Sequence, residues 1–225
     1  MTVTVDAVLL DAGGVLLLPD PAAFRQALAP LGIEPDDETC WRAHYASMRE
    51  IDRIGREDWH TANRALGREV GLPEEALDRA HDAIEGVYLG QEWVAKPGVV
   101  DAMRALREAG LALAIVSNAE GTMEQQLAAH RICQVGDGDG VTVEVVVDSK
   151  VVGVAKPDPR IFTLALEQLG VPGERAVHVG DSVHFDVEGA RAAGVQAIHL
   201  DPHGFCPFDD HPHIRDLHDL LTSLP

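Results

Sequence analysis

The feature that most constrains the fold is a set of four short apolar runs, each followed by polar or glycine residues and then by a helical pattern. The runs are VDAVLL (5–10), LALAIV (111–116), AVHV (176–179) and VQAIHL (195–200). Continuous apolar runs of this length are typical of strands buried on both faces of a parallel sheet. The helices expected as crossovers lie at 99–109, 121–130, 158–169 and 185–193. This alternation predicts a doubly wound, Rossmann-like α/β fold.

Residues 19–96 interrupt the alternation. Apolar and aromatic residues recur there at steps of three and four, as in Trp41, His44, Tyr45, Met48 and Ile51, and again in Leu77, Ala80, Ile84, Val87 and Tyr88. Helix starts are expected at Asp36 or Asp37 and at Pro73-Glu74. So long a stretch exceeds what a connection needs. We therefore expect a helical cap domain at 19–96, inserted into a core domain of residues 1–18 and 97–225; additional core helices are the alternative.

Polar side chains follow the predicted strands at the edge where a doubly wound sheet binds its ligands. The first strand ends at Asp11 and the second at Ser117 and Asn118, while the third is followed by Asp181 and, one helical turn later, Asp186. Carboxylates that converge on one crevice repel one another unless a hard cation lies between them. Oxygen ligands of this kind suit Mg²⁺, so the sequence predicts a magnesium site.

Two further features suit phosphate. Ser117 and Asn118 would lie beside exposed main-chain N–H groups at a helix N-terminus, which can hold phosphate oxygens. Lys156 precedes Pro157 and Pro159, which stiffen the loop and could hold the ammonium group over the crevice. Each residue alone has an ordinary explanation, such as helix capping or surface solvation. Their joint order and spacing favour a phosphate site.

The four motifs resemble those of the haloacid dehalogenase (HAD) superfamily, in the branch with a helical cap inserted after the first motif. The residues that carry the resemblance are Asp11 in DAGGV, Ser117 in VSN, Lys156 in KPDPRIF, and Asp181 with Asp186 in VGDSVHFDVEGARAAGV. The resemblance covers nearly the whole chain. It implies a hydrolase in which Asp11 attacks phosphorus, an aspartyl-phosphate forms, and water releases it.

The resemblance also implies a role for each motif residue. The Mg²⁺ ligands would be Asp11, the carbonyl group of Gly13, Asp181 and Asp186, the last directly or through water. The groups that hold the phosphoryl oxygens would be Ser117, the Asn118 main chain and Lys156. Asp11 and Lys156 would thus be catalytic. The glycines after Asp11 let the main chain turn tightly and point a carbonyl at a cation.

One position departs from the family pattern. Phosphatases of the superfamily usually carry a second aspartate two residues after the nucleophile, which protonates the leaving oxygen, and this chain has Gly13 there. A general acid–base is typically worth about 10²- to 10⁴-fold in rate. We expect a Mg²⁺-dependent hydrolase of a small phosphorylated molecule, with a good leaving group such as an acyl phosphate or with a substitute acid. His184, His44 and His60 are possible substitutes, although histidines on helices are more often packed or solvated.

Three other activities compete with the phosphatase. Gly13 is compatible with a 2-haloacid dehalogenase, because halide leaves without a proton. The family resemblance implies, however, that dehalogenases have a metal-free site with serine and asparagine in the fourth motif, where this chain has Asp181 and Asp186. A protein that binds metal and phosphate but hydrolyses weakly also fits Gly13. A phosphonatase is disfavoured, because it needs a cap lysine for a Schiff base and residues 19–95 contain none.

Net charge, cysteine content and apolar runs limit the classes of partner and the cellular compartment that we expect for this chain. With 37 acidic and 18 basic residues the net charge is −19, which disfavours nucleic acid and anionic membranes and leaves a small substrate. Cys40, Cys133 and Cys206 are far apart and odd in number, which argues against a disulfide framework and fits a reducing compartment. Neither a signal peptide nor an apolar run of about 18 residues is evident, so we expect a cytoplasmic protein, monomeric or homodimeric.

Two remaining segments invite functional readings. QVGDGDG (134–140) lacks both the helix that follows a phosphate loop and the glutamate that ends a calcium loop, so a mobile hairpin turn is expected, with 141–152 paired or extended around it. The segment 201–216 suggests a second metal site through His203, Cys206, His211 and His213. Because this spacing matches no familiar zinc pattern, a substrate-bordering or packing loop is preferred.

Overall fold

The computed structural model describes residues 4–90 and 93–224. It divides into two compact units. The core unit comprises Met1–Leu16, Ala95–Pro202 and Pro207–Pro225, and the helical unit comprises Leu17–Val94 and His203–Cys206. The motif residues singled out above all lie in the core unit.

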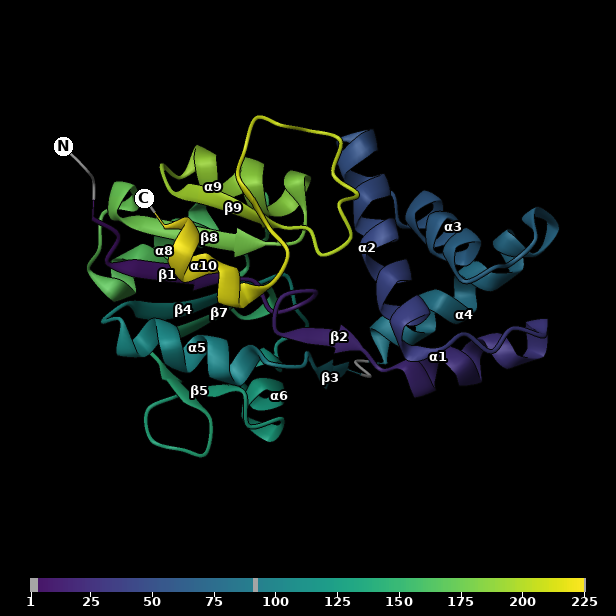
Figure 1. The fold of residues 1–225 in the computed structure, drawn as a ribbon, viewed down its shortest axis with the longest axis horizontal. Helices are drawn as coiled ribbons and strands as arrows, with labels where there is room; N and C mark the ends of the chain where they lie inside the picture. The colour runs from purple at the N-terminus through teal and green to yellow at the C-terminus, as the bar shows by residue number, and fades with distance from the viewer. Residues whose placement is uncertain (1–3, 91–92, 225) are drawn as a thin grey trace. The chain divides into compact units, whose positions relative to one another are not determined.

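The core unit is built on a six-stranded sheet in the order β10-β9-β8-β1-β4-β7. Its strands are β1 (Ala7–Leu10), β4 (Ala112–Ser117), β7 (Val145–Asp148), β8 (Ala176–Gly180), β9 (Gln196–Leu200) and β10 (His213–Ile214). All neighbours pair in parallel, and Leu10 lies opposite both Ile115 and Val179. Figure 1 shows β8, β1 and β4 side by side in this sheet. The predicted parallel α/β sheet is confirmed, and β7 and β10 extend it at its two edges.

Helices cover the sheet because its side chains are apolar on both faces. Ala7 and Leu9 join a core cluster with residues of two helices, among them Ile161 and Phe162, while Val8 and Leu10 point to the opposite face and are equally buried. The helical segments of the core unit are α5 (Val99–Glu108), α6 (Met123–Ala129), α7 (Ser149–Val152), α8 (Arg160–Leu169), η3 (Gly173–Arg175), η4 (Val183–Val187), α9 (Glu188–Ala192), η5 (Leu217–Asp219) and α10 (Leu220–Ser223). The four helices expected as crossovers are all present, within a few residues of their expected bounds.

The expected hairpin at 134–140 is wrong. β5 (Cys133–Val135) and β6 (Val141–Val143) form a two-stranded sheet, but they run parallel. The side chain of Gln134 accepts from the N–H of Gly140 and donates to the carbonyl of Gly136, so the loop's polar groups are satisfied as it returns alongside β5. Residues 149–152, expected to be extended, form α7.

A buried carboxylate holds the loop that follows β4. Asp148, the last residue of β7, lies opposite Ser117 in register. It accepts hydrogen bonds from the N–H groups of Gly121, Met123 and Lys150, at 2.9–3.2 Å. One side chain therefore caps α7 and fixes the main chain leading into α6, which sets the course of the loop at Asn118.

The helical unit contains α1 (Pro21–Leu28), η1 (Ala29–Leu31), α2 (Asp37–Ile54), α3 (Trp59–Glu69), η2 (Glu74–Ala76) and α4 (Leu77–Leu89), with β2 (Leu17–Pro19) paired to β3 (Trp93–Ala95). Its apolar stripes meet in a separate core that includes Phe24, Leu66 and Ile84. Asp36 is the N-cap of α2 and accepts from the N–H of Thr39 at 2.8 Å, which confirms that expected helix start. Among the described residues no helix is long and apolar enough to cross a bilayer.

We expect Asp148→Ala to lower the free energy of unfolding by about 1–3 kcal/mol. The substitution removes the cap of α7 and leaves the N–H groups of Gly121, Met123 and Lys150 without their acceptor. Urea denaturation measures the loss. Asp137→Ala, at an exposed position in the loop between β5 and β6, is the matched control and should change stability by less than about 0.5 kcal/mol. Equal effects of the two substitutions would contradict this role for Asp148.

Candidate active site

Asp11 begins the site at the carboxyl end of β1. Its N–H donates to the carbonyl of Val179 at 2.9 Å, which extends the pairing of β1 with β8 one residue beyond the strand. Its Oδ1 accepts from the N–H of Ala12 at 2.7 Å. The carboxylate is buried and fixed by the main chain immediately after a central strand.

The main chain turns sharply after Asp11. Gly14 has φ 70°, in the left-handed region where a side chain is strained, so the second glycine of DAGG serves the turn itself. Gly13 precedes it and is half-buried. The assignment of the Gly13 carbonyl to a metal ion stays a prediction.

Lys156 lies between two of the predicted acidic residues. Its Nζ is 2.7 Å from Oδ1 of Asp11 and 2.6 Å from Oδ1 of Asp186, and the residue is only 4% exposed. A buried ammonium group this close to two carboxylates forms charge-assisted hydrogen bonds to both. The three residues come from distant parts of the chain, so this bridge brings the first, third and fourth motifs to one point.

Asn118 holds the main chain of Lys156 in place. Its Oδ1 accepts from the N–H of Lys156 at 2.7 Å, and its Nδ2 donates to the carbonyl of the same residue at 3.0 Å. The amide thus pairs with Lys156 much as a neighbouring strand would, next to the cis peptide bond that links Lys156 to Pro157. The side chain of Asn118 therefore positions the lysine. The phosphoryl contact expected of the Asn118 main chain stays a prediction.

Asp186 is surrounded by donors. Its Oδ1 accepts from Nζ of Lys156 and lies 2.9 Å from Nε2 of His178, and its Oδ2 accepts from the N–H of Ser182 at 3.1 Å. It sits in the single π-helical turn η4, a feature frequent at functional sites. A Cβ on Gly180 would come within 2.0 Å of the Asp186 side chain, so only glycine fits there.

His178 is a site residue that the sequence analysis missed. It lies on β8, is fully buried, and packs edge-to-face on Phe162 at 4.9 Å between ring centroids. Burial lowers the pKa of His178 despite the hydrogen bond to Asp186, so the ring is neutral and donates through Nε2. The signal was the histidine inside the apolar run AVHV, where an uncharged polar group needs a buried partner.

The three predicted metal-binding carboxylates lie close together. One oxygen each of Asp11, Asp181 and Asp186 lies within 4.8 Å of the other two. Burial raises the pKa of Asp11 to about 7, with Lys156 opposing and the other two carboxylates adding to the rise. Burial acts the same way on Asp186, but the charge of Lys156 and the His178 bond outweigh it and lower its pKa.

Lys156 therefore bridges two carboxylates with a third nearby, and the raised pKa of Asp11 shows that its negative charge is the hardest to keep in this buried group without a further cation. A divalent cation with oxygen ligands is the chemistry this donor set fits. Because both oxygens of Asp186 already accept hydrogen bonds, Asp186 is better suited to a supporting role than to direct ligation.

Ser117 ends β4 beside this group. The register that places Leu10 opposite Ile115 puts Ser117 at the same edge of the sheet as Asp11, and its side chain is buried. His184, the possible substitute acid within the core unit, lies 3.2 Å from Oε2 of Glu188 through its Nδ1. His44 and His60 lie in the helical unit, where His44 bonds the Tyr88 hydroxyl at 3.0 Å.

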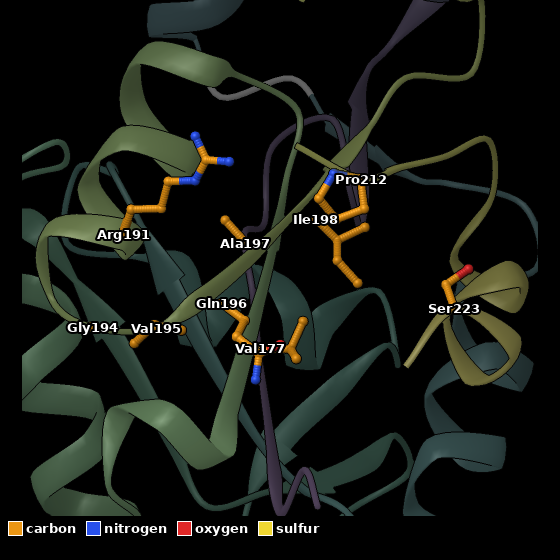
Figure 2. A pocket seen from close by; sticks show the side chains of 9 residues that line it. All are labelled: Val177, Arg191, Gly194, Val195, Gln196, Ala197, Ile198, Pro212 and Ser223. Carbon is orange, nitrogen blue, oxygen red and sulfur yellow. The ribbon is translucent and has the colours of Figure 1, made fainter. Parts of the chain in front are cut away.

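A separate pocket of about 540 Å³ lies along β9. Figure 2 shows that its side chains come from β8, β9 and the segments on either side of β9, with Ser223 contributed by α10. Its lining is Val177, Arg191, Gly194, Val195, Gln196, Ala197, Ile198, Pro212 and Ser223. This set contains none of the residues predicted to bind substrate or metal, so the pocket is distinct from the carboxylate site.

Comparison with known proteins identifies the class to which this site belongs. Residues 5–194 match the haloacid dehalogenase-like hydrolase family, and the chain is a member of it. Over 189 residues it is 31% identical to the ribulose-1,5-bisphosphate 5-phosphatase of Halopiger xanaduensis, which covers 80% of this chain and 76% of that protein. Over 138 residues it is 41% identical to the phosphoserine phosphatase of Thermus thermophilus, covering 61% of this chain and 51% of that protein. The chain thus matches about half the length of this last relative.

Solved structures agree on the fold. A HAD phosphatase from Thermococcus onnurineus superposes with a TM-score of 0.58 at 24% identity, over 97% of both chains. A 2-haloacid dehalogenase from Pseudomonas syringae superposes with a TM-score of 0.57 at 22% identity, over 98% of both chains. The shared fold therefore does not separate a phosphatase from a dehalogenase.

We expect Lys156→Met to lower the free energy of unfolding by about 3–5 kcal/mol, because it leaves Asp11 and Asp186 buried without their cation. Guanidinium denaturation measures this. The control is Lys150→Met, which removes an exposed lysine 3.5 Å from Glu120 and should cost under about 1 kcal/mol. A loss at position 156 no larger than at position 150 would contradict the bridging geometry.

Proposed function

We propose that the protein is a Mg²⁺-dependent phosphatase that acts on a small phosphorylated molecule through an aspartyl-phosphate at Asp11. The observation that carries the proposal is the Lys156 bridge between Asp11 and Asp186 at the carboxyl end of β1. Two relatives similar to this chain are named phosphatases of small metabolites, which supports phosphate as the group removed.

Asp11 is suited to be the nucleophile. Its Oδ1 is held by Lys156 and by the N–H of Ala12, so the carboxylate is oriented and Oδ2 is the oxygen that attacks phosphorus. A bond forms between Oδ2 and phosphorus, and the ester P–O bond breaks. Water then attacks the same phosphorus, which returns the carboxylate and releases inorganic phosphate.

The neighbouring groups stabilise the charge that develops. Lys156 and the Ser117 hydroxyl would hold the phosphoryl oxygens, and the Asn118 side chain keeps the lysine's main chain in place. Asp11, Asp181 and the Gly13 carbonyl would hold the Mg²⁺, with Asp186 supporting. When bound, Mg²⁺ supplies positive charge to the phosphoryl oxygens and offsets the repulsion between the carboxylates.

Gly13 limits the leaving groups that this mechanism can accept. It offers no acid to protonate the leaving oxygen, so a leaving group that departs as a stable anion is favoured. Acyl phosphates and aryl phosphates meet this requirement. We further propose that the helical unit is the cap of the enzyme, since it is a separately packed helical unit contributed by one long insertion, and that its side chains select the substrate.

We expect Mg²⁺-dependent release of phosphate from acetyl phosphate and p-nitrophenyl phosphate, abolished by chelator and by Asp11→Asn. A continuous phosphate assay on purified protein measures it. Turnover that equals that of Asp11→Asn would contradict the proposal.

Restoring the missing acid provides a second test. We expect Gly13→Asp to raise kcat/KM for an alkyl phosphate such as glycerol phosphate by about 10²- to 10⁴-fold, with a much smaller gain on acetyl phosphate, because only the alkyl ester needs the proton. Gly13→Asn has the same size without the acid and is the control. An equal gain from Asn, or an equal gain on both substrates, would show that the missing acid is not the limit.

The second candidate is a 2-haloacid dehalogenase, which Gly13 favours because halide leaves unprotonated. Halide release from a short 2-haloacid in the presence of chelator, with phosphate release absent, would replace the phosphatase by this reaction. The three clustered carboxylates weigh against it, since they suit a metal-dependent site.

A further inference from the structure

Three histidines of the core unit cluster at the edge of the sheet formed by β9 and β10. His199 on β9 lies opposite His213 on β10 in register, and His211 belongs to the loop just before β10. The ring centroids are 4.5 Å apart for His211 and His213, 5.3 Å for His199 and His213, and 5.4 Å for His199 and His211. His199 and His211 are buried and His213 is exposed, so the cluster opens to solvent on one side.

Each buried ring has one nitrogen committed to an acceptor. Nε2 of His199 lies 3.1 Å from the carbonyl oxygen of Asp181, which can only accept, so Nε2 carries a proton. Nδ1 of His211 lies 2.7 Å from Oδ1 of Asp210, whose carboxylate is itself held by Arg191. Nδ1 of His211 is therefore the protonated nitrogen of that ring.

These two hydrogen bonds fix the tautomers of His199 and His211, so the unprotonated nitrogens of the two rings face each other. Nδ1 of His199 and Nε2 of His211 are 3.3 Å apart, and in the neutral rings neither carries a hydrogen to donate. Such a contact repels unless a proton or a cation lies between the nitrogens.

The separation of the nitrogens matches shared coordination. Two imidazole nitrogens at about 2.0–2.1 Å from one zinc ion, at a tetrahedral angle, lie about 3.3 Å from each other. One ring nitrogen from each of His199, His211 and His213 lies within 4.8 Å of the other two. The hydrogen bonds from the far side of His199 and His211, to a carbonyl and to a carboxylate, are the arrangement that orients zinc-binding histidines.

We propose that His199, His211 and His213 bind one Zn²⁺ ion, which fastens β10 and the preceding loop to β9 at the edge of the sheet. Three neutral imidazoles leave a fourth position for water, and nitrogen ligands select zinc over the magnesium that suits the carboxylate site. Cys206 belongs to the helical unit, so the three histidines alone form the cluster within the core unit. The expectation of a substrate-bordering or packing loop at 201–216 was formed without His199, which lies on β9, outside that segment.

The histidine cluster is also connected to the candidate active site by one hydrogen bond. The carbonyl that His199 holds belongs to Asp181, one of the clustered carboxylates. Binding zinc would therefore fix the main chain of Asp181 without contributing a ligand to the magnesium site. The inference stands whether or not the proposed phosphatase activity is found, because it rests on a different set of side chains.

Zinc binding to the untagged, full-length protein tests the proposal, measured by competition with a chromophoric chelator in excess Mg²⁺. We expect one Zn²⁺ per chain and a zinc-induced rise in Tm. His213→Gln, at an exposed position where folding should be unaffected, should weaken binding at least about tenfold, as should His211→Gln. Two controls should keep both signals: His130→Gln, an exposed histidine elsewhere in the core unit, and Asp181→Asn, which retains the main-chain carbonyl that holds His199.

Asp210→Asn removes the carboxylate that orients His211 and leaves the three ligands in place. It should weaken zinc binding by about 10- to 100-fold. Co²⁺ substitution gives an independent readout, because nitrogen ligation in a tetrahedral site produces visible absorption that His213→Gln would remove. Zinc affinity unchanged by His213→Gln and His211→Gln, or lost in Asp181→Asn, would overturn the proposal and assign any bound zinc to the carboxylate site or to adventitious binding.

Discussion

The site depends on one buried cation held between two buried anions. An ammonium group that is removed from water costs several kcal/mol, and Lys156 recovers that cost only because Asp11 and Asp186 both lie within 2.7 Å of it. Asp11 and Asp186 follow strands β1 and β8, which are neighbours in the sheet, so the bridge depends on that parallel pairing. The geometry of the site therefore depends directly on the strand order of the sheet.

The surrounding residues serve that bridge. Asn118 fixes the main chain of the lysine, His178 and Ser182 occupy the lone pairs of Asp186, and the bare Gly180 gives the Asp186 side chain room. The clustered carboxylates of Asp11, Asp181 and Asp186 together carry more negative charge than Lys156 can neutralise. A cation and a phosphoryl group supply what this arrangement lacks, which is why a metal-dependent phosphatase is the function that fits it best.

Much of the fold could be predicted from the sequence, because apolar runs report burial on both faces of a strand directly. β7 and β10 were missed as separate sheet strands, since β10 is two residues long and VTVEVVVDSK gives no sign that it divides into β6, β7 and α7. The Gln134 side chain bonds to the loop between the parallel strands β5 and β6, a contact that no local pattern reveals. Asp11, Asp181 and Asp186 were found because the ends of parallel strands meet at one edge, and Lys156 was found because two prolines stiffen its loop. By contrast, His178 and the histidine cluster depend on side-chain partners distant in sequence.

The most direct test of the central claim is to identify the atom that receives the phosphoryl group. Protein mixed with acetyl phosphate and Mg²⁺ and quenched in acid within one turnover can be digested and mapped by mass spectrometry. The account predicts a phosphoryl adduct on the peptide that contains Asp11, located at that residue and absent from Asp11→Asn. Phosphate release with no adduct at Asp11, or with the adduct on another residue, would contradict it.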